Sequence, residues 1–356
     1  MKDNKLNALN ISVMYIGAIM GAGFASGRET WQFFGVFGKG GIAGAVVFAV
    51  LFMILGHIIR YNAKVLQTNN MGKIIVPGGN RKIELFVETF MAAILATVMI
   101  IMSAAGGALL HQQFGFDYYV GGLLIVFLTV ITVLGDFERV SKVFRYIMPV
   151  LCVAMVLTCL IALFAGLEPI DDGVVINPSP AAPNWPIASI LYVCYNMMAL
   201  ISIVATSTIN AKDDKTAVRG ATMGAVFLGL LAMLILVTIL VDPGFSQAMD
   251  MPILGYANRV SRLMSNIYTI ILFCAIYSAS TSNYYGFTTR IKDGPKKKWI
   301  IIITALGGFV LGLFGFKNFV SYISPIVGYV GIVVVVILVC NFFSLRKQEK
   351  AKNGES

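Results

Sequence analysis

The stretch with the clearest chemical potential is IGAIMGAGFASGRET, residues 16–30, where four glycines and then an Arg-Glu pair fall in a long apolar segment. Glycine lowers the cost of leaving helical geometry. Unpaired backbone N–H and C=O groups are tolerated at membrane depth only where they line a cavity or are buried in protein. An interruption here would offer N–H groups to a carboxylate and carbonyl oxygens to a cation. Alternatively, the small residues only let two helices pack closely.

Two ionisable residues, Arg28 and Glu29, directly follow this run. Charged side chains within a membrane segment are costly, so their presence indicates a function. They could gate a pathway or meet a substrate, or they could lie in an outer, water-filled vestibule. Elsewhere, Asn196 is one of the few strongly polar side chains at the centre of an apolar segment.

No arrangement of residues indicates catalysis or a bound cofactor. The chain has no nucleophile accompanied by a base and an orienting group, and GVFGKGG at 35–41 lacks the spacing of a phosphate-binding loop. The five cysteines fall in apolar segments without CxxC spacing, which favours neither a zinc site nor a disulfide framework. We therefore expect no enzyme activity.

The composition is that of a membrane protein. Of the 356 residues, 58% are hydrophobic and 12% are charged, and the mean hydropathy is +0.83. Soluble domains carry roughly twice that share of charge, about 25%. A spanning helix needs about 20 apolar residues. The sequence predicts an all-α fold with ten spans, at about 8–36, 40–63, 83–112, 117–135, 143–166, 185–210, 217–241, 255–288, 299–316 and 318–344.

The loops between these segments indicate a topology. Lys and Arg collect on the cytoplasmic side of a membrane. If the N-terminus lies inside, most of the 27 basic residues fall in alternate, cytoplasmic loops and in the C-terminal tail, and the outer loop 167–184 has none. This alternation predicts ten spans with both termini in the cytoplasm. It also explains the net charge of +10 without nucleic-acid binding.

Two segments resemble each other. VLGDFERVSKVFRYIMPV at 133–150 and VLGLFGFKNFVSYISPI at 310–326 share VLG-x-F and Tyr-Ile-x-Pro, and the matching tyrosines are 176 positions apart. Proline near the start of a membrane helix is common, which is the simpler explanation. A real repeat would relate residues 8–166 to 185–344 with inverted topology, because five is odd, inside one transmembrane domain 1–356 with a tail at 345–356. The same offset carries Gly21–Gly23 onto Met197–Ala199, so we expect a second interruption beside Asn196, in span 6.

Ten helices, an inverted 5+5 repeat and a glycine-broken first helix resemble the amino acid–polyamine–organocation superfamily, which has the LeuT fold. GAGFASGRE looks like its amino-acid permease branch of YkvI-like bacterial membrane proteins, and the resemblance covers about residues 8–344. It implies a multi-pass protein of the bacterial cell membrane.

The resemblance also implies a sodium site between spans 1 and 8. Carried over, its ligands are the carbonyls of Gly17, Met20 and Ser278 and the hydroxyls of Thr281 and Ser282. Alternatively, the Ser and Thr residues of YSASTSN only bond to their own helix.

Three departures from the family qualify this resemblance. Ala18 replaces the Asn of a second sodium site, and span 5 contains no Lys that could substitute for sodium. Many members pair an Arg of helix 1 with an acid of helix 10. Residues 318–344 contain no Asp or Glu, so Arg28 must have another partner.

The leading functional hypothesis is a sodium-coupled symporter of a small zwitterion, such as an amino acid. The substrate carboxylate would rest on the amides of Gly21, Ala22 and Gly23, with Tyr195, Asn196 and Ser103 lining the rest of the pocket. A proton is the alternative coupling ion, and a betaine, a nucleobase or a sugar is an alternative substrate. A sensing subunit that binds ligand without transporting it is the second hypothesis.

Overall fold

The computed structural model describes residues 5–79, 81–135, 137–167, 176–289, 291–292 and 294–352, and most of them are helical. Among these residues, the only extended pairing is a single bridge between Leu6 and Ala211. The helices are α1 (Ala8–Ile19), α2 (Ala22–Ala25), α3 (Arg28–Phe33), η1 (Gly35–Phe37), α4 (Lys39–Leu66), α5 (Met71–Ile75), η2 (Pro77–Gly79), α6 (Arg81–Phe114), α7 (Tyr118–Leu134), α8 (Phe137–Phe164), α9 (Trp185–Ile209), α10 (Asp214–Ile239), α11 (Pro243–Ala248), α12 (Pro252–Val260), α13 (Arg262–Thr288), α14 (Lys297–Gly312), α15 (Phe316–Asn318), η3 (Phe319–Ile323) and α16 (Ser324–Lys352).

Seven of the described helical segments are long and apolar enough to cross a membrane. The other three expected spans correspond to shorter pieces. The first span is divided among α1, α2 and α3, α7 has 17 residues, and α14 has 16. The expected tail at 345–356 starts inside α16, and residues 353–356 lie outside the described part of the chain. Large apolar side chains such as Phe127 and Phe164 are exposed on the surface, as they are where lipid covers a protein.

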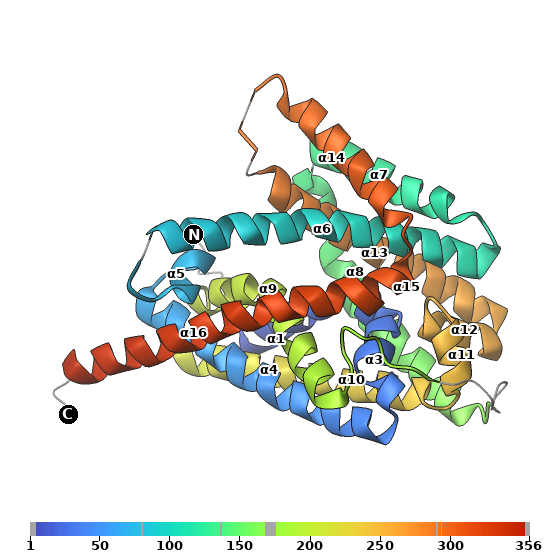
Figure 1. The fold of residues 1–356 in the computed structure, drawn as a ribbon, viewed down its shortest axis with the longest axis horizontal. Coiled ribbons are helices and arrows are strands. Elements are labelled where there is room, and N and C mark those ends of the chain that lie inside the picture. The colour runs from blue at the N-terminus through green and yellow to red at the C-terminus, as the bar shows by residue number, and fades with distance from the viewer. Residues whose placement is uncertain are drawn as a thin grey trace.

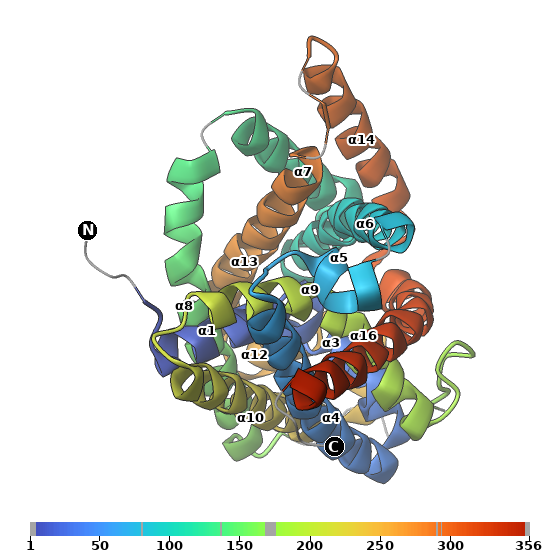
Figure 2. The ribbon, with the colours of Figure 1, turned by 90° about the vertical axis from the view of Figure 1, so that its left-hand side faces the viewer.

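The long helices form a bundle around the interrupted first segment. In Figure 1, α6 and α16 run lengthwise across the molecule, and α7 and α14 lie beyond α6. Helix α6 packs against α7, α13 and α14, whereas α9 packs against α4 and α16, and α10 packs against α1 and α4. Figure 2, turned by 90°, shows α1 and α10 side by side, and it shows α4 and α16 next to each other in the lower part of the view.

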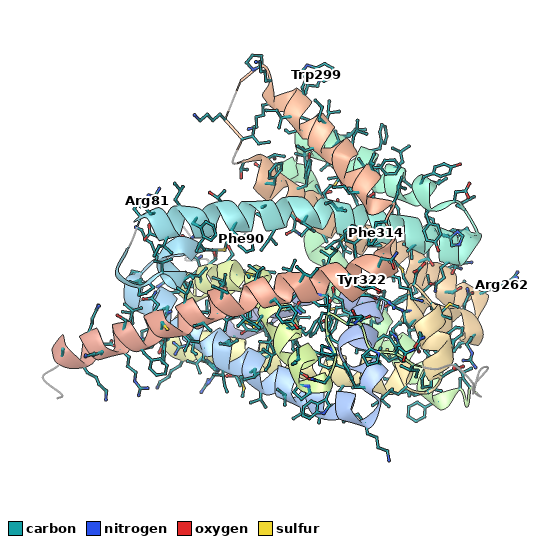
Figure 3. The ribbon with its side chains drawn as sticks, viewed as in Figure 1. Arg81, Phe90, Arg262, Trp299, Phe314 and Tyr322 are labelled. Carbon is teal, nitrogen blue, oxygen red and sulfur yellow. The ribbon has the colours of Figure 1, made fainter. Side chains whose placement is uncertain are left out.

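The ends of the bundle can be compared with the topology that the basic residues predict. That topology puts the start of α6 inside and the start of α13 outside. Figure 3 shows Arg81, at the start of α6, at one end of the molecule and Arg262, at the start of α13, at the other. The two helices therefore enter the bundle from opposite ends, as the alternation of Lys and Arg requires.

The first apolar segment is not one helix. Helix α1 ends at Ile19, Met20 leaves the helical region with ψ of 62°, and Gly21 is extended before α2 begins. A second turn follows at Gly27, whose φ of +79° is in the left-handed region that glycine adopts without strain. A Cβ atom on Gly27 would also stand 2.8 Å from Ile253 Cγ1. Glycine at this position therefore permits the change of direction between α2 and α3 and their close contact with Ile253.

The prediction of a second interruption, beside Asn196, was wrong. Helix α9 runs continuously from Trp185 to Ile209, through Asn196. Its only proline, Pro186, stands in the first turn, and the helix contains no glycine. The Asn196 side chain is accommodated inside the helix because its Nδ2 donates to the Tyr192 carbonyl at 2.9 Å, one turn earlier.

Candidate functional site

A cavity of about 570 Å³ lies at the interruption of the first segment. Most of its walls come from α1, α2, α3, α6, α9 and α13, and α5, α8 and α16 contribute one residue each. Ten of the residues expected at the site line it: Gly17, Met20, Gly21, Ala22, Gly23, Glu29, Tyr195, Asn196, Ser278 and Ser282. Residues from spans 1, 6 and 8 thus meet in one chamber, although the sequence separates Gly17 from Ser282 by most of the chain.

The backbone at the interruption is rearranged in a specific way. In a continuous helix the Gly21 N–H would donate to the Gly17 carbonyl, four residues earlier. It donates instead to the Ile19 carbonyl at 2.6 Å. The Gly17 carbonyl therefore loses its helical donor, which suits the expected cation ligand, whereas the Gly21 amide already has a hydrogen-bond acceptor in the Ile19 carbonyl. Ala22 and Gly23 start α2, where the first N–H groups have no partner inside the helix.

The hydroxyl residues of α13 divide into two groups. Ser278 and Ser282 line the cavity. Thr281 does not line it but is fully buried, and its Oγ1 has no hydrogen-bond partner among the described residues. A buried hydroxyl without a partner costs free energy, about 1–3 kcal/mol, and calls for an explanation. Coordination of a cation by this hydroxyl oxygen would be one such explanation.

Ser103 lies away from this chamber, which corrects its expected place in the pocket. It lines a second cavity of about 290 Å³, together with Tyr118, Asp250 and Lys317. Its Oγ would stand 3.1 Å from a Cβ atom added at Gly122 in α7 or at Gly312 in α14. The absence of side chains at these glycines lets α7 and α14 approach this face of α6, so position 103 points toward them.

Glu29 points into the central cavity. It is 7% exposed, and its carboxylate accepts hydrogen bonds from Tyr192 Oη at 3.0 Å and Tyr195 Oη at 3.4 Å. Of the four ion pairs found between described residues, none includes Glu29. The carboxylate is thus held by neutral donors on the α9 wall, and it belongs to the chamber rather than to an outer vestibule.

Arg28 points the other way. Its Nη1 donates to the carbonyls of Gln247 at 3.3 Å and Met249 at 3.1 Å, at the end of α11. Lys317 donates to the same Gln247 carbonyl at 2.7 Å. Backbone carbonyls therefore supply the hydrogen bonds of Arg28, and Asp250, an acid outside residues 318–344, lies near enough to interact with its charge. Arg28 and Glu29 are adjacent in the sequence but serve opposite sides of α3.

Tyr192 is a site residue that the sequence reasoning missed. It is fully buried, with its ring 4.8 Å from that of Phe33, 5.3 Å from Phe34 and 5.0 Å from Phe48, measured between centroids. This packing fixes the hydroxyl on Glu29. The spacing held a signal, because Tyr192 precedes Tyr195 by three positions and Asn196 by four, which is one face of a helix.

Comparisons with known proteins give the fold. No family model matches the chain. Two proteins of Bacillus subtilis (strain 168) are similar to it: the uncharacterized membrane protein YkvI, 24% identical over 89% of this chain and 90% of that protein, and the uncharacterized protein YyaD, 23% identical over 83% and 84%.

Two solved structures resemble it across most of its length. One is Mhp1, a nucleobase-cation-symport-1 family transporter with bromovinylhydantoin bound; the TM-score is 0.55 at 15% identity, over 89% of this chain and 74% of Mhp1. The other is an Eremococcus coleocola manganese transporter, with a TM-score of 0.52 at 14% identity, over 98% and 88%. The chain is therefore a multi-pass membrane protein with the fold of LeuT-like transporters.

Proposed function

We propose that this protein is a secondary active transporter of the bacterial cell membrane, which moves an amino acid or a similar small zwitterion together with sodium. The observation that carries the proposal is the cavity at the broken first segment, where rearranged backbone groups meet hydroxyl groups of α13 and polar side chains of α9. In LeuT-like transporters, irregular backbone at membrane depth lines the binding site.

The proposed cation site lies between α1 and α13. Its ligands are the carbonyls of Gly17, Met20 and Ser278 and the hydroxyls of Thr281 and Ser282. Hard oxygen ligands of this kind suit a small hard cation. Two features support the site: the Gly17 carbonyl has lost its helical donor to Ile19, and the buried Thr281 hydroxyl has no partner among the described residues.

The proposed substrate lies beside the cation, between α2 and α9. The amides of Ala22 and Gly23 and the side chains of Tyr195 and Asn196 border this part of the cavity. A cavity of about 570 Å³ falls within the range of roughly 300–1,000 Å³ that small-molecule sites occupy. A nucleobase, a betaine or a sugar would also fit that volume, and Mhp1 shows that this fold accommodates a hydantoin.

The proposed cycle is alternating access, and we assign this conformation to the state that is open toward the cytoplasm. Met71 and Thr289 line the cavity, and both stand next to loops rich in Lys and Arg. The opposite side is closed by α3, whose residues Arg28 to Phe33 are all buried, and by Tyr268, which donates to the Ala25 carbonyl at 2.6 Å. Release of the cation into the cytoplasm would then let the substrate leave.

Flux measured in proteoliposomes tests the proposal. Protein reconstituted with an inward sodium gradient should accumulate one member of an amino-acid panel above its outside concentration. An inward potassium gradient should not drive this accumulation. Binding without accumulation would favour the sensing subunit instead, and accumulation driven equally well by a proton gradient in sodium-free buffer would remove sodium from the mechanism.

A further inference from the structure

The cavity contains a carboxyl group of its own, that of Glu29, at the place where the substrate carboxylate is expected. A Cβ atom built on Gly23 would stand 2.1 Å from Glu29 Oε1 and 2.4 Å from its Cδ. The Glu29 carboxylate therefore lies in contact with the backbone of Gly23, at the beginning of α2. A second carboxylate could not enter this space without strong repulsion between like charges.

We infer that Glu29 binds the positively charged amino group of the substrate, so that the substrate class is a primary amine or amino acid recognised through its ammonium end. This inference rests on the proposed function, and it deepens that function by reversing the orientation expected for a zwitterion. The amine, rather than the carboxylate, lies at the interruption of the first segment.

The hydrogen bonds of Glu29 leave room for such a partner. An ionised carboxylate has about four lone-pair positions. Tyr192 and Tyr195 use one each, from the α9 side. Glu29 lines the cavity, so its remaining acceptor positions are available to a bound molecule. An ammonium group has three N–H donors that can fill them.

In its ionised form, the Glu29 carboxylate would need a counter-charge. Moving an ionised carboxylate out of water is expensive unless an opposite charge or hydrogen bonds compensate for it. Arg28, the neighbour in sequence, is committed to Gln247 and Met249 on the other side of α3. The described ion pairs of the chain lie elsewhere, at Asp214, Glu84 and Asp242. A bound ammonium group would be the missing counter-charge.

The geometry also limits the size of the cationic end. Gly23 on one side and the paired rings of Tyr192 and Tyr195, whose centroids are 6.4 Å apart, surround the carboxylate. A compact ammonium can approach within hydrogen-bond distance, whereas a quaternary ammonium has no N–H to donate and is bulkier. We therefore expect primary amines to be preferred over betaines.

The experiment compares matched sets of three molecules with the purified full-length protein. The sets are leucine, isopentylamine and isocaproate; phenylalanine, phenethylamine and hydrocinnamate; and alanine, ethylamine and propionate. Each molecule is tested for its effect on thermal unfolding, in sodium and in potassium. In at least one set, the amino acid and the amine should stabilise the protein, and the acid without an amino group should not.

Substitution of the carboxylate then tests the residue. Glu29→Gln keeps the shape and should weaken binding of the amine by at least about tenfold, which corresponds to about 1.4 kcal/mol. The matched control is Glu349→Gln, because Glu349 is also a carboxylate that accepts from a tyrosine hydroxyl, Tyr61, but is exposed near the end of α16. This control should bind like the unmodified protein. Tyr195→Phe, which removes one donor and leaves the carboxylate, should have a smaller effect.

Three results would overturn the inference: stabilisation by the acids but not the amines, no stabilisation by any amine, or equal affinity of Glu29→Gln and the unmodified protein. Flux separates this failure from that of the proposed function. If a solute is accumulated equally well by Glu29→Gln and by the unmodified protein, the protein is a transporter but Glu29 does not recognise an ammonium group. If binding of an amine depends on Glu29 but the amine is not accumulated, Glu29 recognises the ammonium group and the protein is not a transporter of it.

Discussion

The Glu29 carboxylate packs directly against the backbone of Gly23 in the wall of the cavity. A Cβ atom added at Gly23 would stand only 2.1 Å from Glu29 Oε1. The two residues are brought together by the left-handed conformation of Gly27, which interrupts the helical chain between α2 and α3. Glycine at 23 is therefore explained by close approach of a side chain, in addition to any opening of the helix.

Gly23→Ala should lower the thermal stability of the ligand-free protein. The added methyl group displaces the Glu29 carboxyl group and breaks its hydrogen bonds to Tyr192 and Tyr195, each worth about 0.5–1.5 kcal/mol, or about 1.5–3 kcal/mol when the acceptor is ionised. Unfolding monitored in detergent measures the loss. Gly286→Ala is the matched control, because Gly286 also lines the cavity and its Cβ would make only an ordinary contact, 3.5 Å from Leu95.

A double-mutant cycle checks that the loss comes from this contact. In a Glu29→Ala background, Gly23→Ala should cost less by about 1 kcal/mol or more, since the clashing group is absent. Additive losses would mean that Gly23→Ala acts through the backbone alone, and the wall formed by the two residues would then be unimportant.

Thr281→Val should separate stability from sodium binding. The substitution replaces a buried hydroxyl that has no described partner, so the ligand-free protein should unfold at the same temperature or higher. The sodium concentration needed for half of the thermal stabilisation should rise at least about tenfold, the equivalent of about 1.4 kcal/mol.

Thr269→Val serves as the control for Thr281→Val. Thr269 lies in the same helix, is also buried, and donates to the Ser265 carbonyl at 2.7 Å. The substitution should lower stability modestly and leave the sodium response unchanged. An unaltered sodium response in Thr281→Val would remove Thr281 from the proposed site.

The glycine run was informative because it has a local physical consequence. Gly21 and Gly27 stand where the backbone leaves helical geometry, and such positions can be read from residue type. The same holds for the apolar segments, whose length and composition make seven described helices able to span a membrane. Membrane character and a broken first segment are thus within reach of the sequence.

Other features depend on packing between distant segments, which the sequence alone does not contain. The expected break near Asn196 failed because an amide can bond back to its own helix, and a repeat offset carries no information about that choice. Ser103 was assigned to the substrate pocket, but its direction is set by glycines in α7 and α14. Glu29 could be identified as important, yet only the turn at Gly27 brings it into the cavity.

Arg28→Ala should loosen the outer closure. Arg28 and Lys317 both hold the end of α11 through its backbone carbonyls, and the substitution removes two of these three hydrogen bonds. Amide hydrogen exchange in residues 246–251 should accelerate by about tenfold or more if at least 1.4 kcal/mol of local stability is lost. Arg262→Ala, at the exposed start of α13, should leave this exchange unchanged. Unchanged exchange in Arg28→Ala would show that Lys317 and the remaining contacts are sufficient.

Gly328→Ala should destabilise the contact between α16 and α9 that backs the binding wall. A Cβ atom at Gly328 would stand 2.7 Å from the Leu191 carbonyl oxygen, and backbone cannot move aside as a flexible side chain can. Inserting one carbon into a packed interface typically costs about 1–3 kcal/mol. The melting temperature should fall, and because Leu191 precedes Tyr192, affinity for the bound amine should fall with it.

Gly307→Ala is the control: its Cβ would meet nothing within 4 Å, and alanine favours helix by up to about 1 kcal/mol. Equal melting temperatures for the two variants would mean that α16 can shift away from α9 without cost, and the wall formed by α9 would then not depend on this packing.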